Sequence, residues 1–367
     1  MKGIWKYSHL LPSLRDRSKL SLGEGNTPLL KSRRLGVALG LDNLYFKLEL
    51  LNPSGSYKDR FAASAVSELI DKELRFCLAT SSGNTGAALA AYCAAANIKC
   101  FLAIVDGAPS GKIQQMQVYG SETMMVKDFG ISPQVSSDVF SGLQQIASKH
   151  GSLVQISAYR YSPFGMAGVQ TIAYEIAEEL PDAGCHVFSP AGGGGLTLAI
   201  ARGFNIWEEN HRGYQKPKVH CVQPAGNDTM ATPLRSGLHE AKAVSKSTTL
   251  ISGLQVPNVI DGDDVIATCR ANGGTGFSVT DASIFECQKN MAVQEGIYCE
   301  PAGAVALAGV LKALENKEIK RGDHIICVVT GHGFKDPASA KKITGEDRGR
   351  YFNSHGETLA FIETQLI

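Results

Sequence analysis

Short apolar segments rich in β-branched and aromatic residues alternate with alanine-rich segments through most of the chain. Such alternation is typical of mostly parallel sheets with helices on both faces, so it predicts an α/β fold. The expected strands are Leu44–Leu50, Phe76–Thr80, Cys100–Val105, Thr123–Val126, His186–Ser189, Val219–Val222 and His324–Val329. Helices are expected at Ala87–Ala96 and Ala302–Ala313, and long loops near the functional site at 224–268. The stretch 354–367 is assigned no role.

Composition excludes several classes of function. The 367 residues suggest two domains or one large α/β unit. With 36 Lys+Arg against 35 Asp+Glu, the net charge of +1 gives no basis for binding nucleic acid or an anionic membrane. We find no apolar run long enough to span a membrane and no signal-peptide pattern at Met1. Neither nucleic acid nor a membrane is therefore expected as a partner.

Cysteine spacing points to a reducing compartment. The nine cysteines are an odd number, and they are scattered without a Cys-x-x-Cys pair. This pattern argues against a disulfide framework and against a structural zinc site, and we expect no metal. We expect most cysteines to be small buried apolar residues in a cytoplasmic protein.

A lysine stands at the expected start of a helix. Asn52-Pro-Ser-Gly-Ser-Tyr-Lys58 forms a turn, and the segment after Arg60 has apolar residues at helical spacing. The positive end of a helix dipole disfavours a second cation and can lower the pKa of such a lysine. A neutral amine can form a Schiff base with an aldehyde cofactor. The alternative is a surface lysine paired with Asp59.

Three glycine-containing corners each follow an expected strand and open a helix, where free N–H groups favour anions. The first is Thr80-Ser-Ser-Gly-Asn-Thr-Gly86, whose hydroxyl and N–H groups suit a small carboxylate. Asn84 adds an amide for a ring hydroxyl. An ordinary helix-capping turn would use the same residue types.

The second corner is Ala191-Gly-Gly-Gly-Gly-Leu196. Four successive glycines cost backbone entropy and are hard to justify on structural grounds, but they let several N–H groups converge on a phosphate. The spacing fits neither the dinucleotide pattern nor the nucleotide P-loop. We therefore predict a phosphate outside these two classes of ligand.

The third corner is Thr330-Gly-His-Gly-Phe-Lys-Asp336, after the last expected strand. Ligand contacts in α/β sheets lie at such strand ends, and the Thr330 hydroxyl could bond a neutral ring nitrogen. His332 is a candidate acid or base, or a turn residue between two glycines.

Together these segments resemble the pyridoxal 5'-phosphate enzymes of fold type II, most closely the threonine synthase-like enzymes. The resemblance extends over nearly the whole chain. It includes Ser21–Leu29, Asn52–Arg60, Ser81–Gly86, Glu300–Ala304 and Thr330–Pro337. It implies two αβα domains, a large cofactor-binding domain of residues 1–77 and 157–367 and a small mobile domain of residues 78–156 inserted in it. By analogy the enzyme is expected to be a homodimer.

The resemblance also implies roles for individual residues. Lys58 would be the Schiff-base lysine and would move the Cα proton. Asn84 would bond the 3'-oxygen of the cofactor ring and Thr330 its nitrogen. The cofactor phosphate would bind at Gly192, Gly193, Gly194, Gly195 and Leu196. The substrate carboxylate would bind at Ser81, Ser82, Gly83 and Thr85.

Two departures from the family pattern bear on the substrate. The glycine corner is more similar to serine and threonine dehydratases. In Ser162–Thr171, Gly165 stands where threonine synthases have an arginine that binds the phosphate of O-phosphohomoserine. Arg160 or Lys112 could take its place, or Arg160 could be a solvated loop residue.

Three hypotheses follow from the sequence. The first is a threonine synthase-like lyase that releases phosphate from O-phosphohomoserine or a related phosphorylated amino acid. The second is a serine or threonine dehydratase-like enzyme of β-elimination or β-replacement. The third is a non-catalytic cofactor-binding protein, against which Lys58 and the complete set of expected cofactor contacts argue.

Overall fold

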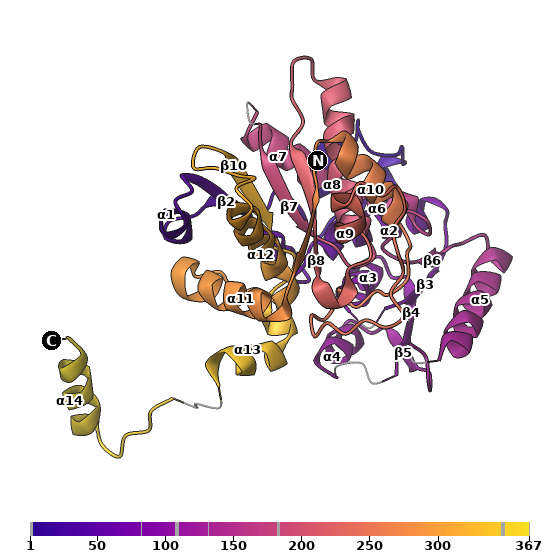
Figure 1. The fold of residues 1–367 in the computed structure, drawn as a ribbon. Helices are drawn as coiled ribbons and strands as arrows, with labels where there is room; N and C mark the ends of the chain where they lie inside the picture. Colours follow the sequence, from indigo (N-terminus) through magenta and orange to yellow (C-terminus); the bar gives the residue numbers. More distant parts are fainter. Residues whose placement is uncertain are drawn as a thin grey trace.

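Two β-sheets form the framework of the molecule (Figure 1). The computed structural model describes residues 3–81, 83–106, 110–130, 132–181, 184–345 and 349–366. The six-stranded sheet has the order β1-β2-β10-β7-β8-β9, and the four-stranded sheet has the order β5-β4-β3-β6. All neighbouring strands are parallel except β1, which pairs antiparallel with β2. This arrangement confirms the predicted α/β fold.

The strands of the six-stranded sheet are β1 Leu29–Lys31, β2 Asn43–Lys47, β7 His186–Pro190, β8 Lys218–Pro224, β9 Gly276–Val279 and β10 His324–Val328. Those of the four-stranded sheet are β3 Phe76–Thr80, β4 Lys99–Ile104, β5 Glu122–Met125 and β6 Val154–Gln155. The seven predicted strands are present, but the one predicted for Leu44–Leu50 ends at Lys47. A 3₁₀ turn follows it, in which the Glu49 carboxylate lies 2.7 Å from the buried Arg60 guanidinium.

Helices cover both sheets. The α-helices are α1 Leu35–Leu39, α2 Lys58–Asp71, α3 Asn84–Ala95, α4 Ser110–Val118, α5 Pro133–Lys149, α6 Pro163–Val169, α7 Thr171–Glu179, α8 Gly195–Asn210, α9 Ala231–Arg235, α10 Gly262–Ala271, α11 Asp281–Glu295, α12 Pro301–Glu315, α13 Pro337–Thr344 and α14 His355–Leu366. The 3₁₀ helices are η1 Gly3–Tyr7, η2 Asp16–Ser18, η3 Glu49–Leu51, η4 Ala225–Asn227 and η5 Gly333–Lys335.

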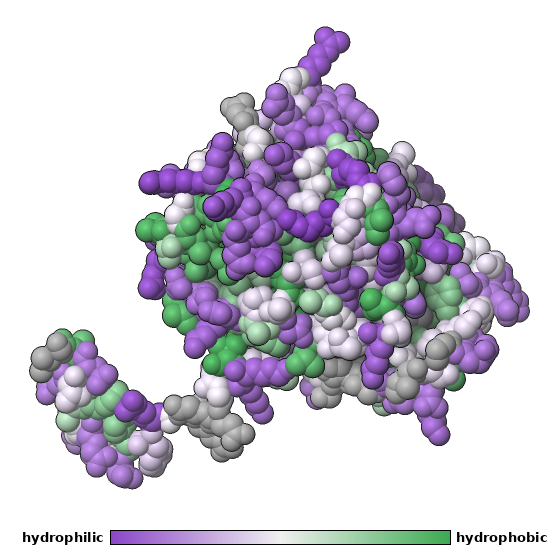
Figure 2. Space-filling view, viewed as in Figure 1, coloured by the Kyte–Doolittle hydropathy of each residue, from purple (hydrophilic) through white to green (hydrophobic). Residues whose placement is uncertain are grey.

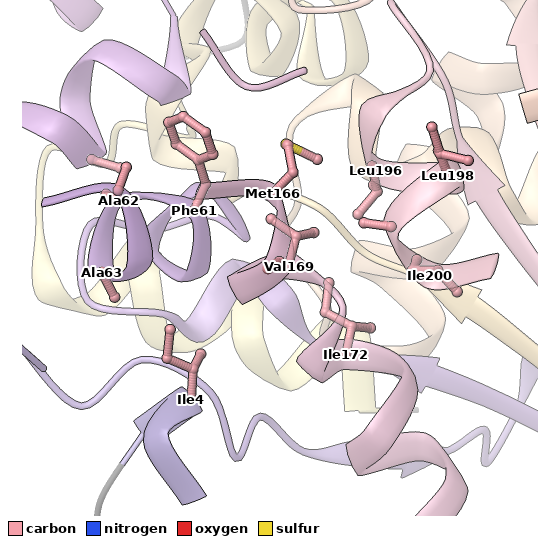
Figure 3. Close-up of a cluster of buried hydrophobic side chains, with 14 of the residues drawn as sticks. Ile4, Phe61, Ala62, Ala63, Met166, Val169, Ile172, Leu196, Leu198 and Ile200 are labelled. Carbon is pink, nitrogen blue, oxygen red and sulfur yellow. The ribbon is translucent and has the colours of Figure 1, made fainter. Parts of the chain in front are cut away.

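Helix α2 links the two sheets through its neighbours. It packs against α6 and α3, and it also contacts β3. Its alanines and the absence of proline favour a helix, and its side chains from Asp59 to Ser67 are buried. Figure 3 shows the resulting apolar cluster, in which Phe61 of α2 lies near Met166 of α6. The first residue of α2 is therefore held on a buried scaffold.

The predicted loop region 224–268 is only partly a loop. Residues 236–261 form no helix or strand, as predicted, whereas α9 and the start of α10 lie within the range. The loop passes beside the glycine corner, since a Cβ at Gly192 would meet the Gly253 carbonyl oxygen at 3.0 Å. The loop therefore lies beside the corner that the sequence predicts to bind a phosphate.

The C-terminal helix stands apart from the rest of the chain. Helix α14 has no buried residue, and in Figure 1 it lies away from both sheets. Figure 2 shows hydrophilic and hydrophobic residues together on it, and hydrophilic side chains over much of the main body on this face. Among the described residues, no helix has the length and apolar character needed to span a membrane.

Candidate active site

The turn before α2 is tied to the segment that follows β10. Gly55 has a positive φ of 88°, which glycine adopts without strain. The Tyr57 N–H donates to the Thr330 carbonyl at 3.0 Å, and the His332 N–H donates to the Gly55 carbonyl at 2.9 Å. These bonds bring the turn before Lys58 and the third corner predicted from the sequence to one place.

Lys58 is the first residue of α2 and is half-buried. Its Nζ lies 2.5 Å from Ser157 Oγ and 4.5 Å from the centre of the Tyr57 ring. Burial lowers the pKa of Lys58 to about 7, and the negative charge of Glu300 opposes this shift. A large fraction of the amine is therefore neutral near pH 7, as a nucleophile requires.

Asp59 is not the partner of Lys58. The Asp59 carboxylate is buried, and it accepts hydrogen bonds from the Ser54 N–H and hydroxyl, both at 3.0 Å. Burial raises the pKa of Asp59 to about 7. The alternative of a surface lysine paired with Asp59 is therefore wrong.

The first corner lies where α3 begins. The Ser81 hydroxyl accepts hydrogen bonds from the Gly83 and Gly86 N–H groups, at 3.3 and 3.0 Å, so it caps the helix. The Thr85 Oγ1 lies 3.0 Å from Ser157 Oγ. A Cβ on Gly83 would meet nothing within 4 Å, so the space beside it is open. Ser82 lies outside the described residues.

Glu300 joins two of the predicted site residues. Its Oε1 accepts from the Asn84 amide at 2.6 Å, and its Oε2 lies 3.6 Å from Lys112 Nζ. The Glu300 side chain is buried at the start of α12, and its N–H donates to the Gly331 carbonyl at 2.9 Å. A Cβ on Gly331 would lie 2.3 Å from the Glu300 carboxylate, so a side chain there would displace this carboxylate.

The glycine corner connects β7 to α8. Gly194 has a φ of 96°, and a Cβ there would lie 2.7 Å from Val265. A Cβ on Gly195 would lie 2.8 Å from the Ser157 carbonyl oxygen, so this corner lies against the residue that contacts Lys58. The expectation that these glycines lack a structural reason is wrong for Gly192, Gly194 and Gly195, because their neighbours leave little or no room for a side chain. Gly193 has ordinary space around it.

The glycine corner retains its capacity to bind an anion. Helix α8 begins at Gly195, so the N–H groups of its first turn, including that of Leu196, have no partner within the helix. Close packing around the glycines fixes the direction of these groups. A helix of this length places the positive end of its dipole at the same point.

The third corner contains an unpaired buried hydroxyl. Thr330 follows β10, and its buried Oγ1 has no hydrogen-bond partner among the described residues. The same holds for Asn84 Oδ1. His332 accepts a hydrogen bond from the Phe334 N–H at its Nδ1, so it caps η5 as a turn residue.

The residues around Lys58, which include Asn84, Thr85, Ser157, Glu300 and Thr330, are called the Lys58 cluster below. A cavity of about 520 Å³ opens beside this cluster, at the turn before Lys58 and the third corner. It is lined by two lysines, Lys112 and Lys335, together with Gln115, His332 and the turn at 50–55. Lys112 is buried and donates to Ser252 Oγ at 3.1 Å, and Lys335 donates to the Ser54 carbonyl at 2.8 Å. Burial lowers the pKa of Lys335 to about 8. The cavity therefore has a basic wall.

The other sequence candidate for a phosphate clamp, Arg160, does not join these residues, and Gly165 has no room for the family's arginine. The Arg160 guanidinium is exposed and lies 5.9 Å from the centre of the Tyr161 ring. Only the backbone N–H of Arg160 donates to the Asp261 carboxylate, at 3.2 Å. Gly165 is buried where α6 crosses α2, and a Cβ there would lie 2.5 Å from the Phe61 ring. An arginine at Gly165 has no space beside Phe61.

Sequence reasoning assigned no role to three residues of the candidate site, which are Ser157, Glu300 and Lys335. Ser157 has no motif around it, so no signal could have identified it. Glu300 and Lys335 belong to the segments Glu300–Ala304 and Thr330–Pro337. Both segments carried the family resemblance, so a signal for these two residues was present in the sequence.

The residues present fit an aldehyde-bearing pyridine phosphate. Lys58 supplies an amine with a lowered pKa. The unpaired polar atoms of Asn84 and Thr330 face one cluster with it, and the N–H groups of the glycine corner suit a phosphate. Fold and site together define a pyridoxal 5'-phosphate enzyme of fold type II.

Comparisons with known proteins agree with this class. Residues 20–331 match the family model described as "Pyridoxal-phosphate dependent enzyme". Threonine synthase of Methanocaldococcus jannaschii is 33% identical over 94% of this chain and 83% of its own. Threonine synthase of Synechocystis is 31% identical over 93% and 85%.

Solved structures share the fold. The processed form of threonine deaminase isoform 2 from Solanum lycopersicum has a TM-score of 0.73 and 24% identity, over 93% of this chain and 92% of its own. Serine racemase from Dictyostelium discoideum has a TM-score of 0.69 and 26% identity, over 84% and 92%. The chain belongs to the pyridoxal-phosphate dependent enzyme family. It is a pyridoxal-phosphate-dependent lyase similar to threonine synthase.

Proposed function

We propose that the chain acts on an amino acid whose side chain carries a phosphate leaving group, as threonine synthases do. The observation that carries this proposal is the basic wall formed by Lys112 and Lys335 beside the Lys58 cluster. Glu300 contacts both Asn84 and Lys112, so the wall adjoins the proposed cofactor site. A substrate joined to the cofactor beside Asn84 would reach this wall with a distal anionic group.

Lys58 is proposed as the Schiff-base lysine and as the group that removes the Cα proton. Its lowered pKa keeps the amine available as a base near neutral pH. Bound pyridoxal 5'-phosphate supplies the electron sink for the negative charge that develops at Cα. Ser157 lies between Lys58 and Thr85 and orients the amine by a hydrogen bond.

The remaining proposed roles are in binding. The N–H groups from Gly192 to Leu196 hold the cofactor phosphate, and Thr330 faces the ring nitrogen. Asn84 bonds the 3'-oxygen of the ring. The α-carboxylate of the substrate binds at the N-terminus of α3, through Gly83, Thr85 and the Ser81–Ser82 segment.

The position of the phosphate-binding cations differs from the family pattern. The family's arginine is absent because Gly165 is needed for the α2–α6 contact. Lys112 is proposed to supply the positive charge, with Lys335 beside it. Arg160 stays a candidate only if its side chain turns away from Tyr161.

The second candidate is a dehydratase-like lyase that acts on serine or threonine. The glycine corner and the loss of the arginine at Gly165 favour it. The two functions differ in product, since the first releases inorganic phosphate and the second releases a keto acid and ammonia. A non-catalytic cofactor-binding protein would give neither.

The deciding experiment compares substrates in one assay. The holoenzyme is incubated with O-phosphohomoserine, O-phosphoserine, serine or threonine, and phosphate and keto acid are both measured. We expect phosphate release from O-phosphohomoserine, with threonine as the second product, and loss of this activity in Lys58→Ala. Keto acid from serine or threonine without phosphate release would replace the first function with the second.

The quaternary and domain organisation is also proposed. Residues 78–156 are proposed as a small domain that closes over the site and excludes water, since the four-stranded sheet lies between Phe76 and Gln155. We propose a cytoplasmic homodimer. Sedimentation of the holoenzyme at several concentrations tests the assembly.

A further inference from the structure

Three cysteines that are far apart in the sequence lie together inside the four-stranded unit. Cys77 is in β3, Cys93 in α3 and Cys100 in β4, and their sulfur atoms all lie within 4.8 Å of one another. Cys77 and Cys100 are register partners on neighbouring parallel strands, and Cys93 covers them from α3. Sequence spacing gave no sign of this group.

The group is deep in the protein. Cys77 and Cys93 are completely buried, Cys100 is 4% exposed, and all three belong to one hydrophobic cluster. The three thiols therefore face one another within an apolar interior.

The spacing suits one ion bound by three sulfurs. An ion about 2.3 Å from each of three sulfur atoms in a plane holds them about 4.0 Å apart, and a pyramidal arrangement brings them closer. Thiolates select soft, thiophilic ions. The distances between the three sulfur atoms are therefore compatible with both a planar and a pyramidal complex of such an ion.

Charge decides which ion the interior accepts. A buried uncompensated charge is costly in an apolar interior, so the complex must be close to neutral. A trivalent ion forms a neutral complex with all three sulfurs bound as thiolates, whereas a divalent or monovalent ion is neutral only when one or two thiols keep their protons. We propose that Cys77, Cys93 and Cys100 form a binding site for one trivalent thiophilic metalloid. Arsenite is the form of such a metalloid that serves as the probe below.

The binding reaction needs no oxidant or reductant. As(OH)₃ reacts with three thiols to give As(S-Cys)₃ and three water molecules. Three As–O bonds break and three As–S bonds form, and each thiol proton leaves with a hydroxide as water. Arsenic stays trivalent throughout.

The site lies directly behind the substrate loop. Cys77 is three residues before Thr80, where β3 ends, and Cys93 is on the helix that begins at Asn84. A bound metalloid would cross-link β3, α3 and β4. It would therefore stabilise this unit and restrict the segment 81–86 that is proposed to bind substrate.

The test is arsenite binding to the reduced holoenzyme under anaerobic conditions. Bound arsenic is measured by mass spectrometry, and the number of sulfur ligands by X-ray absorption. We expect one arsenic per chain with three sulfur ligands, and slower amide exchange over residues 84–95. The protein is incubated with arsenite for longer than these amides need to exchange fully. The interior then opens during the incubation, and a negative result cannot mean that arsenite failed to reach the thiols.

Single variants identify the ligands. Cys93→Ala places alanine on an alanine-rich helix face, and we expect it to fold and to lose affinity by more than about 10-fold, because even outer-shell changes cost that much at metal sites. Cys287→Ala, in the other large hydrophobic cluster, is the matched control and should bind arsenite like the unaltered chain.

Three results would overturn the proposal. They are no binding by the unaltered chain, equal binding by Cys93→Ala, and a preference for Cd²⁺ or Cu⁺ over arsenite in competition. None of these results bears on the proposed lyase function, which the substrate assay tests separately.

Discussion

Ser157 Oγ lies 2.5 Å from Lys58 Nζ and 3.0 Å from Thr85 Oγ1, so one hydroxyl joins the proposed catalytic amine to the proposed carboxylate site. Ser157 belongs to the segment after β6, and its carbonyl oxygen lies against Gly195 of the glycine corner. A single residue thus contacts three parts of the site. The geometry of proton transfer depends on where this segment holds Lys58.

Removal of the Ser157 hydroxyl should slow the reaction without unfolding the protein. Ser157→Ala leaves Lys58 free to adopt other rotamers, and small displacements of a reacting group can cost roughly 10- to 100-fold in rate. We expect kcat to fall by about this factor and the pH profile of kcat to shift. Thr85→Val is the matched variant, because it removes the second hydroxyl and leaves the Lys58 contact in place. An unchanged kcat in Ser157→Ala would remove the proposed role.

The amine of Lys58 should titrate near neutral pH. Burial lowers its pKa to about 7, whereas an ordinary lysine has a pKa of about 10.4. Because only the neutral amine reacts, acylation of Lys58 in the cofactor-free protein should be half-maximal near pH 7. Peptide mass spectrometry measures the extent of labelling at each pH.

The same pKa determines how Lys58 changes the free energy of unfolding as the pH changes. The folded-state pKa lies below the unfolded value, so the folded state binds this proton less well. Its contribution to stability is complete above pH 10.4 and decreases as the pH falls toward 7.

In the acylation experiment, labelling of Lys58 that rises only above pH 9 would show that the pKa of Lys58 is not lowered.

The basic wall should matter only for a phosphorylated substrate. Lys335→Met removes a cation and leaves the Lys112–Glu300 pair intact. A charge-assisted hydrogen bond contributes roughly 1.5–3 kcal/mol, so kcat/KM for O-phosphohomoserine should fall roughly 10- to 150-fold. The kcat/KM for an unphosphorylated amino acid should change little. An equal loss for both substrates would mean that Lys335 supports the fold and does not bind the leaving group.

Much of the framework could be predicted from the sequence, because it depends on local pattern. The apolar runs identified seven strands, and the turn before Lys58 identified the start of α2. The missed strands are β1, β6 and β9, which have three, two and four residues. Strands β1 and β6 are too short to show a period. Strand β9 is as long as the predicted β5, but Gly276 and Ser278 leave it no continuous apolar run.

The rest of the site depends on contacts between distant segments. Ser157 meets Lys58 from 99 residues away, and Cys77, Cys93 and Cys100 meet through sheet register. Neither relationship leaves a periodic signal in the sequence. Gly165 could be recognised as a departure from a motif, but its reason, the ring of Phe61, appears only when α6 crosses α2.

The α2–α6 crossing should not tolerate a side chain at Gly165. Gly165→Ala places a Cβ about 2.5 Å from the Phe61 ring and should cost about 1–3 kcal/mol of unfolding free energy, as overpacked cores do. Gly165→Arg should be worse and should not restore a phosphate clamp. Gly142→Ala in α5 is the control, because a Cβ there has open space. It should stabilise by up to about 1 kcal/mol in denaturant unfolding.

A buried histidine pair should make the protein sensitive to acid. The Thr275 N–H donates to His220 Nδ1 at 3.1 Å, so the His220 proton lies on Nε2, which donates to His186 Nδ1 at 3.0 Å. Burial, together with the neighbouring His186, lowers the pKa of His220 to about 3. Burial also lowers the pKa of His186, so both rings are neutral in the folded state at pH 7.

The folded-state pKa of His220 lies below the unfolded value of about 6.5, so protonation favours the unfolded chain. Its contribution is complete above pH 6.5, and unfolding free energy should fall by up to about 1.4 kcal/mol per pH unit below that, until the pH reaches about 3. His220→Gln keeps an acceptor and a donor but has no titratable ring. The difference in unfolding free energy between this variant and the unaltered chain, measured from pH 7 to 4.5, isolates the histidine from the carboxylates. A constant difference over that range would contradict the assignment.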